Sequence, residues 1–203
     1  MESINRNEKE YNLIAIESDC WLQIMEGALK SSHPFHQPVV ANATTIGANM
    51  RMVVLRNASA AEKTISFYTD IRSGKWEELQ NNQSISWLFY NPESRTQIRL
   101  SGKASLHQND ELANHAWKNV NSNSRKNYSS ILTPSSKIID PKKSLHQEDR
   151  IITENNEEGR GNFGVVVTNI LWMEWLWLNP GGHYRANFIY DKNRDFTSSW
   201  LVP

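Results

Sequence analysis

One stretch of the sequence, residues 51–75, gathers residue types that could bind a phosphate group. A β-rich run ends in Tyr68-Thr69, and residues 70–75 then have the composition of a helix start. The N-terminus of a helix presents unpaired N–H groups and the positive end of the helix dipole. Hydroxyls and cations placed there would complete an anion site, and the alternative is an ordinary capped surface helix with solvated basic side chains. The side chains in question are those of Thr69, Arg72, Ser73 and Lys75.

Gln97 is a second candidate, because it lies in a strand-like run in which apolar Ile98 and Leu100 alternate with polar residues. A buried amide needs hydrogen-bond partners. A Gln side chain both donates and accepts, which suits a ring edge offering both kinds of group, such as that of a flavin. The same alternation also allows Gln97 to face solvent.

The C-terminal third combines a tryptophan-rich run, Leu171–Trp177, with a glycine-rich turn at Gly181-Gly182. His183 and Arg185 follow two residues apart, which places them on one face of a strand. The tryptophans fit a core or a subunit interface better than a cofactor wall. His183 and Arg185 are placed as a substrate-facing pair, and the alternative for the histidine is a solvated position beside the turn.

Other chemistries are disfavoured by composition and by missing motifs. Lys plus Arg equals Asp plus Glu, at 22 each, so the chain has no bulk attraction for nucleic acid or anionic lipid. The single cysteine, Cys20, and the scattered histidines predict no metal site. Neither a GxGxxG nor a GxxxxGK pattern occurs at a suitable place. The polar N-terminus and the lack of an apolar run of about 18 residues predict a cytoplasmic protein outside the membrane.

The elements that must position these residues are mostly short strands. We expect one domain over residues 1–203, with an N-terminal tail over about 1–17 and a flexible loop over about 133–160. A hairpin with its turn at 47–49 should join the first two strands. Expected helices cover 18–30, capped by Ser18 or Asp19, about 73–82, capped by Asp70 or Ser73, and 110–119. Expected strands cover 39–46, 51–56, 64–69, 84–90, 95–107, 162–177, 184–190 and 196–203.

Many short strands with turns at close intervals favour a mainly β fold, an antiparallel β-barrel with flanking helices. Open strand edges and a large aromatic content also favour a dimer, because one barrel cannot cover both.

In this order, the segments resemble the pyridoxamine 5'-phosphate oxidase family of split barrels, over about residues 39–203. The resemblance rests on RMVVLR, on FYTDIRSGK followed by a helix and Asn-Asn, on QIRLSGKA, and on the segment from Trp177 to Arg185 with the closing WLVP. It implies an FMN cofactor held at the interface of a homodimer. The RSGK variant and the long segment after residue 120 place the chain in a divergent branch.

The resemblance also implies roles for individual residues. Tyr68, Thr69 and Lys75 match positions near the cofactor phosphate, and Arg72 could replace a family arginine whose position is Gly74 here. Arg56 matches a basic residue that touches both flavin and substrate. The remaining cofactor positions are Arg51, Met52, Val53, Val54, Ser73, Gln97, Ser135 and Trp177, of which Ser135 would come from the neighbouring subunit.

The substrate side departs from the family. Its Arg-x-His motif is His183-Tyr184-Arg185 here, and a later arginine is Asn187. The groups that grip the substrate phosphate have no clear match, although Arg125 and Tyr128 are nearby in sequence.

We therefore predict an FMN-dependent oxidoreductase that acts on an unidentified small molecule and oxidises pyridoxamine 5'-phosphate slowly or not at all. The substrate-side candidates are Arg56, His183 and Arg185. The alternatives are a flavin carrier or sensor without turnover, and a barrel without a cofactor.

Overall fold

The computed structural model describes residues 2–6, 9–139 and 157–203. The described chain forms two compact units. Unit 1 takes residues from Met1–Phe67, Gln83–Ser105 and Val167–Pro203, and unit 2 takes residues from Tyr68–Asn82 and Leu106–Val166. No helix among these residues is long and apolar enough to cross a bilayer.

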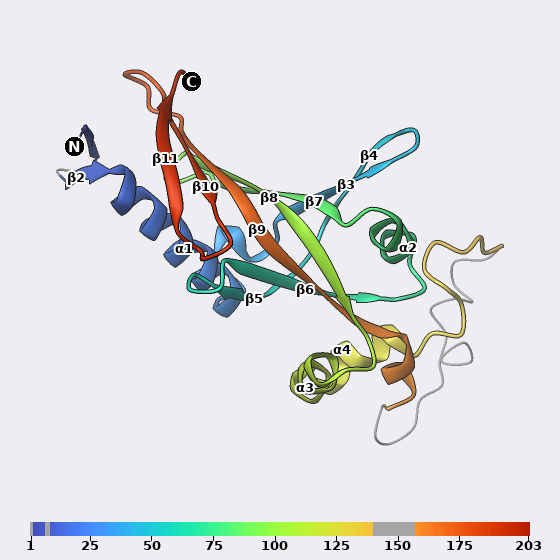
Figure 1. Ribbon diagram of the computed structural model, residues 1–203. Coiled ribbons are helices and arrows are strands. Elements are labelled where there is room, and N and C mark those ends of the chain that lie inside the picture. The colour runs from blue at the N-terminus through green and yellow to red at the C-terminus, as the bar shows by residue number, and fades with distance from the viewer. Residues whose placement is uncertain (1, 7–8, 140–156) are drawn as a thin grey trace. The chain divides into compact units, whose positions relative to one another are not determined.

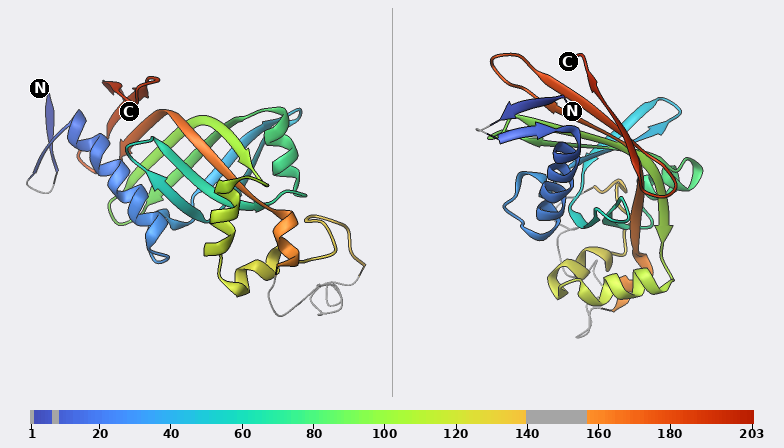
Figure 2. Two further views of the ribbon diagram at one scale, coloured as in Figure 1. Left: turned by 60° about the horizontal axis from the view of Figure 1, so that its bottom comes forward. Right: turned by 60° about the vertical axis from the view of Figure 1, so that its left-hand side comes forward.

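The main sheet is antiparallel and has the strand order β11-β10-β9-β8-β7-β3-β4, while β6 pairs with both β5 and β9. Figures 1 and 2 show β8 and β9 running side by side as the two longest strands. The mainly β antiparallel class predicted from the sequence is therefore confirmed. Its strands are β3 Val39–Thr44, β4 Gly47–Met52, β5 Leu55–Ser59, β6 Thr64–Asp70, β7 Ser84–Asn91, β8 Thr96–His107, β9 Phe163–Trp177, β10 Tyr184–Tyr190 and β11 Phe196–Leu201.

The first hairpin differs from its prediction in two ways. Its turn lies at Thr45-Ile46, because Thr44 pairs with Gly47 and the expected turn residues 47–49 belong to β4. Gly47 has a φ of 145°, a conformation that glycine adopts without strain. The expected strand 51–56 is also divided, since β4 ends at Met52 and β5 begins at Leu55. Register along β3 thus outweighs the turn propensity of Gly-Ala-Asn.

The core of unit 1 lies on one face of the sheet, where alternate strand residues are buried. In β8, Ile98 and Leu100 are fully buried. Trp87 in β7 is buried too, and its indole N–H donates to Thr168 Oγ1 at 3.1 Å. The backbones of β8 and β9 approach closely at Gly102, where a Cβ would lie 2.0 Å from the Asn169 carbonyl oxygen.

Helix α1, Leu13–Leu29, begins five residues before the predicted start, and the strands β1 Ser3–Arg6 and β2 Lys9–Asn12 pair antiparallel ahead of it. Asn12 is the N-cap and accepts from the Ala15 N–H at 2.9 Å, so neither Ser18 nor Asp19 caps the helix. The helix packs mainly on β5 and touches β11 (Figures 1 and 2), and a short 3-10 helix, Pro34–His36, follows it.

A buried polar network ties α1 to the rest of unit 1. The Lys63 ammonium lies 2.7 Å from Glu17 Oε1, and both side chains are about nine-tenths buried. The Tyr190 hydroxyl donates to the same carboxylate oxygen at 2.9 Å and accepts from the Trp21 indole N–H at 2.9 Å. Lys63 also lies over the Trp21 and Tyr190 rings. Burial, the Glu17 charge and the hydrogen bond to Glu17 together raise the pKa of Tyr190 well above its usual range, although the bond from Trp21 works against the shift.

Unit 2 consists of short helices around an aromatic cluster. Tyr68, Trp117, Tyr128 and Phe163 meet through edge and tilted ring contacts of 5.0–5.9 Å. Both predicted helices are confirmed, α2 and α3, and Asp110 caps α3. Residues 140–156 of the expected loop lie outside the described residues. The helices are α2 Gly74–Asn81, α3 Glu111–Asn119, α4 Ser122–Arg125, and the 3-10 turns Lys126–Tyr128 and Glu158–Asn162.

Candidate functional site

Three of the predicted phosphate-binding side chains meet in unit 2, where β6 leads into α2. The Lys75 ammonium donates to Thr69 Oγ1 at 3.0 Å and to Ser73 Oγ at 3.3 Å. The two hydroxyl oxygens lie 3.3 Å apart. We call Thr69, Ser73 and Lys75 the hydroxyl–lysine cradle. It gathers a cation and two hydroxyls beside a helix N-terminus, which is the donor set that a phosphate monoester requires.

The turn between β6 and α2 sets the positions of these groups. Ser73 precedes the helix, and both its hydroxyl and its N–H donate to the Asp70 carbonyl, at 2.6 and 3.1 Å. Ser73 is the N-cap residue of α2, one of the two positions predicted from the sequence, although its side chain makes no capping hydrogen bond. Helix α2 is anchored by the buried Trp76, which packs on Gly164: a Cβ at that position would lie 2.5 Å from Trp76 Cζ3.

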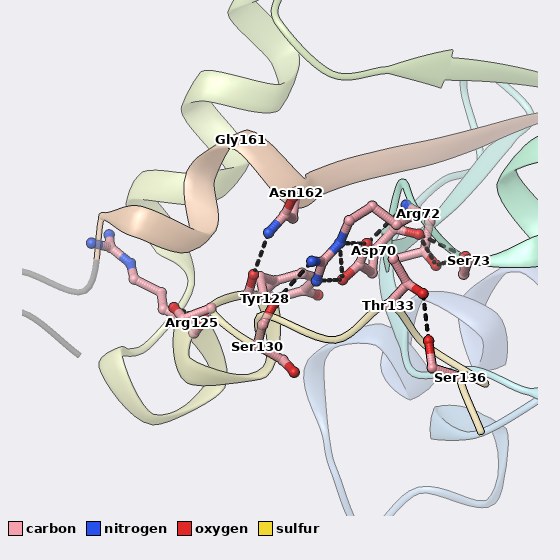
Figure 3. A network of polar contacts seen from close by, with 12 residues as sticks. Asp70, Arg72, Ser73, Arg125, Tyr128, Ser130, Thr133, Ser136, Gly161 and Asn162 are labelled. Atoms are coloured by element: carbon pink, nitrogen blue, oxygen red, sulfur yellow. Dashed lines mark hydrogen bonds and ion pairs between the residues drawn. The ribbon is translucent and has the colours of Figure 1, made fainter. Parts of the chain in front are cut away.

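Arg72 lies in the same turn, but its guanidinium is directed to Asp70 and to a distant carbonyl (Figure 3). Its Nε and Nη2 donate to the Asp70 carboxylate at 3.0 and 2.7 Å, and its Nη1 donates to the Ser130 carbonyl at 2.9 Å. The hydrogen bond to Asp70 raises the pKa of the Arg72 guanidinium above its usual value. Sequence proximity suggested a phosphate contact, whereas the structure shows an internal bridge.

The remaining predicted cofactor residues on the first strands belong to unit 1. Arg51 donates to the Asn42 side chain and to the Asn49 carbonyl. Met52 is 64% exposed, Val53 and Val54 are half-buried, and Arg56 is exposed. None of these side chains belongs to the buried core.

Gln97 is half-buried and lies on the face of β8 opposite to the core residues Thr96 and Ile98. Tyr90 of β7 is its cross-strand neighbour and is 46% exposed. The amide is therefore on the outer face of the sheet, where a ligand or solvent can reach it.

Arg185 takes part in a charge cluster that the sequence reasoning missed. The Glu174 carboxylate is 5% exposed, and Arg185 Nη2 lies 3.0 Å from it, while Arg99 Nε lies at 3.5 Å. The Arg99 guanidinium also covers the Trp172 ring, 5.3 Å from its centroid. A glutamate inside the run Leu171–Trp177 was the available signal, since a buried carboxylate in a strand requires cations on the adjacent strands.

The other C-terminal predictions separate into core and surface. Trp175 is 1% exposed and belongs to the core, as the core interpretation predicts. Trp177 is half-buried and stacks on Tyr184, with ring centroids 5.6 Å apart and planes inclined by 19°. His183 is exposed and directly precedes β10.

The residues considered for a substrate phosphate grip have other partners in unit 2. Arg125 donates to the Trp117 carbonyl at 3.0 Å and to Glu157 at 2.6 Å, and it covers the Trp117 ring. Tyr128 packs in the aromatic cluster. Ser135, with a φ of 68°, lines a hollow of about 260 Å³ together with Asp70 and Arg72.

Comparison with known proteins identifies the domain that carries the cradle. Residues 18–108 match the family model described as pyridoxamine 5'-phosphate oxidase, FMN-binding domain. The matched domain is an FMN-binding domain, which agrees with the FMN cofactor predicted from the sequence. No curated protein sequence matches the chain.

Solved structures support the fold of this FMN-binding domain. A pyridoxamine 5'-phosphate oxidase-related, FMN-binding protein from Nostoc punctiforme PCC 73102 has a TM-score of 0.75 and 17% identity, with coverage of 95% of this chain and 100% of that chain. PhzG from Burkholderia lata 383, in complex with tetrahydrophenazine-1-carboxylic acid, has a TM-score of 0.66 and 20% identity, with coverage of 92% and 90%. At these identities the likeness shows the fold alone, which is the predicted split barrel.

The donors in the cradle fit the cofactor of the family. FMN carries a terminal phosphate, and the Lys75 ammonium supplies a positive charge and N–H donors for it. The hydroxyls of Thr69 and Ser73 lie beside this ammonium and donate to the Asp70 carbonyl, so they would have to rotate to donate to a phosphate. The Cβ-free position at Gly164 lets Trp76 hold the first turn of α2 in place.

Proposed function

We propose that the protein is an FMN-dependent oxidoreductase of the pyridoxamine 5'-phosphate oxidase-like superfamily, acting on an unidentified small molecule. The observation that carries this proposal is the hydroxyl–lysine cradle inside a segment that matches an FMN-binding family. When bound, the flavin would supply the hydride chemistry, and the protein would supply binding, orientation and charge.

Cofactor contacts are proposed for the residues of each unit separately. In unit 2, Thr69, Ser73 and Lys75 would bind the phosphate, with Tyr68 beside them. In unit 1, Arg51 and the segment 52–54 are proposed for the phosphate or ring, Gln97 for the polar ring edge, and Trp177 for a ring face. Ser135 is proposed to act on the cofactor of a second copy.

The direct test is a comparison of FMN with riboflavin. Purified protein should be yellow, with flavin absorption bands, and should bind FMN at least tenfold more tightly than riboflavin, because riboflavin lacks the phosphate. Equal affinities would show that the cradle is an ordinary helix start. A colourless protein that takes up neither flavin would remove the cofactor proposal.

The substrate is proposed to differ from pyridoxamine 5'-phosphate. Arg56, His183 and Arg185 remain the candidates on the substrate side, and Arg125 already donates to Trp117 and Glu157. An anionic or conjugated small molecule is the proposed class. Hydrogen peroxide production from pyridoxamine and pyridoxine 5'-phosphates should have a kcat/KM below about 10⁴ M⁻¹s⁻¹, the low end of ordinary enzymes. A higher value would refute this part of the proposal.

A flavin carrier or sensor without turnover is the second candidate. It is favoured by the engagement of Arg185 with Glu174, because an arginine held by a buried carboxylate is less available to a substrate. Reduction of the bound flavin by a nicotinamide donor or an amine, followed by reoxidation over many cycles, would support the enzyme. Stoichiometric reduction without turnover would support the carrier or sensor.

We further propose a cytoplasmic homodimer with FMN at the subunit interface. Support comes from apolar side chains exposed on sheet strands of unit 1, such as Met50, Leu88 and Leu171, which are 67%, 38% and 40% exposed. An obligate interface of about 2,000 Å² or more is expected. Light scattering should give the mass of two chains at micromolar concentration, and a flavin-loaded monomer would contradict the proposal.

A further inference from the structure

The bridge formed by Arg72 links two segments that are distant in sequence, and neighbouring hydrogen bonds add a third. Its carboxylate partner, Asp70, is in the turn that holds Thr69 and Ser73, and its carbonyl partner, Ser130, is 58 residues away. The Ile71 N–H donates to the Asn162 carbonyl at 2.9 Å, and the Asn162 side chain donates to the Tyr128 carbonyl at 2.8 Å. Figure 3 shows Arg72 between the turn and the segment that contains Ser130.

Asp70 accepts hydrogen bonds at both its backbone carbonyl and its side-chain carboxylate. Its carbonyl accepts from Ser73, which belongs to the cradle, and its carboxylate accepts from the side chain and the backbone N–H of Arg72. The side chain of Asp70 is 8% exposed and that of Arg72 is 21% exposed, so water competes little for these bonds. A movement of Arg72 would therefore shift Asp70, whose carbonyl holds the Ser73 hydroxyl in position.

Hydrogen bonds within the protein already use all three nitrogens of the Arg72 guanidinium. Nε, Nη1 and Nη2 each have a protein acceptor at 3.0 Å or less. A guanidinium in a fixed fork geometry cannot turn to a phosphate without breaking the bidentate contact with Asp70.

We propose that Arg72 is a positioning residue that fixes the hydroxyl–lysine cradle to the segment 127–130, and that it does not contact the phosphate. The proposal deepens the proposed function and rests on it for its binding readout. This proposal differs from the prediction made from the sequence, in which Arg72 binds the phosphate in place of the family arginine whose position is Gly74 here.

The two roles predict opposite signs for Asp70→Asn. If Arg72 bound the phosphate, removal of its carboxylate partner would free a cation, and FMN affinity would stay the same or rise. If Arg72 positions the cradle, Asp70→Asn weakens FMN binding by about tenfold, about 1.4 kcal/mol, and leaves riboflavin binding unchanged. Unchanged or tighter FMN binding overturns the proposal.

Two further variants separate geometry from charge. Arg72→Lys keeps the charge but loses the bidentate fork, so it should lose FMN affinity about as much as Arg72→Gln does. The control is Lys137→Gln, which removes one exposed charge and should leave FMN affinity unchanged. Near-parental FMN binding by Arg72→Lys, with loss only in Arg72→Gln, would show that the charge matters and would overturn the positioning role.

Hydrogen exchange gives a readout that needs no flavin. In Arg72→Gln, backbone amides of residues 127–130 and 70–73 should exchange at least tenfold faster than in the parent protein, while α1 amides remain unchanged. Unchanged exchange in both segments would overturn the bridge even if the parent binds FMN. Failure of the parent to prefer FMN over riboflavin would instead count against the proposed function.

Discussion

Two lysines in this protein are organised in contrasting ways. In unit 1, the Lys63 ammonium meets the Glu17 carboxylate at 2.7 Å and lies over two aromatic rings, with both charges buried. In unit 2, the Lys75 ammonium is surrounded by the hydroxyls of Thr69 and Ser73. The first arrangement neutralises its cation within the fold, whereas the second leaves the cation among neutral hydroxyl oxygens. The comparison shows how surroundings distinguish a structural lysine from a candidate ligand-binding one.

The largest expected effect comes from breaking the buried pair. Lys63→Met would leave the Glu17 carboxylate buried without its counter-charge, which costs about 3–5 kcal/mol of unfolding free energy. Urea denaturation measures the loss. The double variant Glu17→Leu with Lys63→Met should recover most of it, because neither charge is then left alone. A single variant as stable as the parent would show that the pair contributes nothing.

Removal of the second lysine should affect binding more than folding. Lys75→Ala should weaken FMN binding by about 1.5–3 kcal/mol, roughly tenfold or more, the usual contribution of a charge-assisted hydrogen bond. Fluorescence titration with FMN and riboflavin provides the measurement. Lys118→Ala, on the exposed side of α3, is the matched control. Equal weakening for both flavins would assign Lys75 a role other than phosphate binding.

The buried network also predicts a loss of stability at high pH. Because the pKa of Tyr190 is raised in the fold, the unfolded chain loses this proton first as the pH passes 10. The unfolded state then binds fewer protons, so the unfolding free energy should fall by up to about 1.4 kcal/mol per pH unit above pH 10. Below pH 10 the contribution is fully present. Denaturation of Tyr190→Phe should show a correspondingly smaller slope, and equal slopes would contradict the assignment.

The smallest effect is expected from a single hydroxyl of the cradle. Thr69→Val keeps the shape of the side chain and removes its hydroxyl, and it should weaken FMN binding by about 0.5–1.5 kcal/mol. Isothermal titration would resolve the difference from the parent. An effect as large as that of Lys75→Ala would mean that Thr69 orients the lysine in addition to binding the phosphate.

The sequence could predict what depends on neighbours along the chain. The cradle brings together residues at most six apart, so β6, α2 and their hydroxyls and lysine follow from local pattern. The bond between Arg72 and Ser130 and the Arg185–Glu174–Arg99 cluster depend on segments brought together by folding. The local pattern therefore predicts a guanidinium at Arg72 that is available to a phosphate, whereas in the folded chain this guanidinium donates to Ser130.

The same limit explains the errors in the elements. The start of α1 was misplaced because the polar residues before Ser18 resemble a tail, although Asn12 forms the cap. The hairpin turn was misplaced because Gly-Ala-Asn has turn propensity, whereas pairing with β3 extends the strand through it. In both cases a contact that sequence periodicity does not record determined the boundary.

The absence of a side chain at Gly164 restricts which residues homologous proteins can have at neighbouring positions. Since a Cβ at Gly164 would collide with the Trp76 ring, the two positions cannot change independently. A larger residue at 164 would need smaller ones at both 71 and 76, because the added Cβ would also lie 2.7 Å from Ile71 Cγ2. In an alignment of homologues, the residues at positions 71, 76 and 164 should therefore covary.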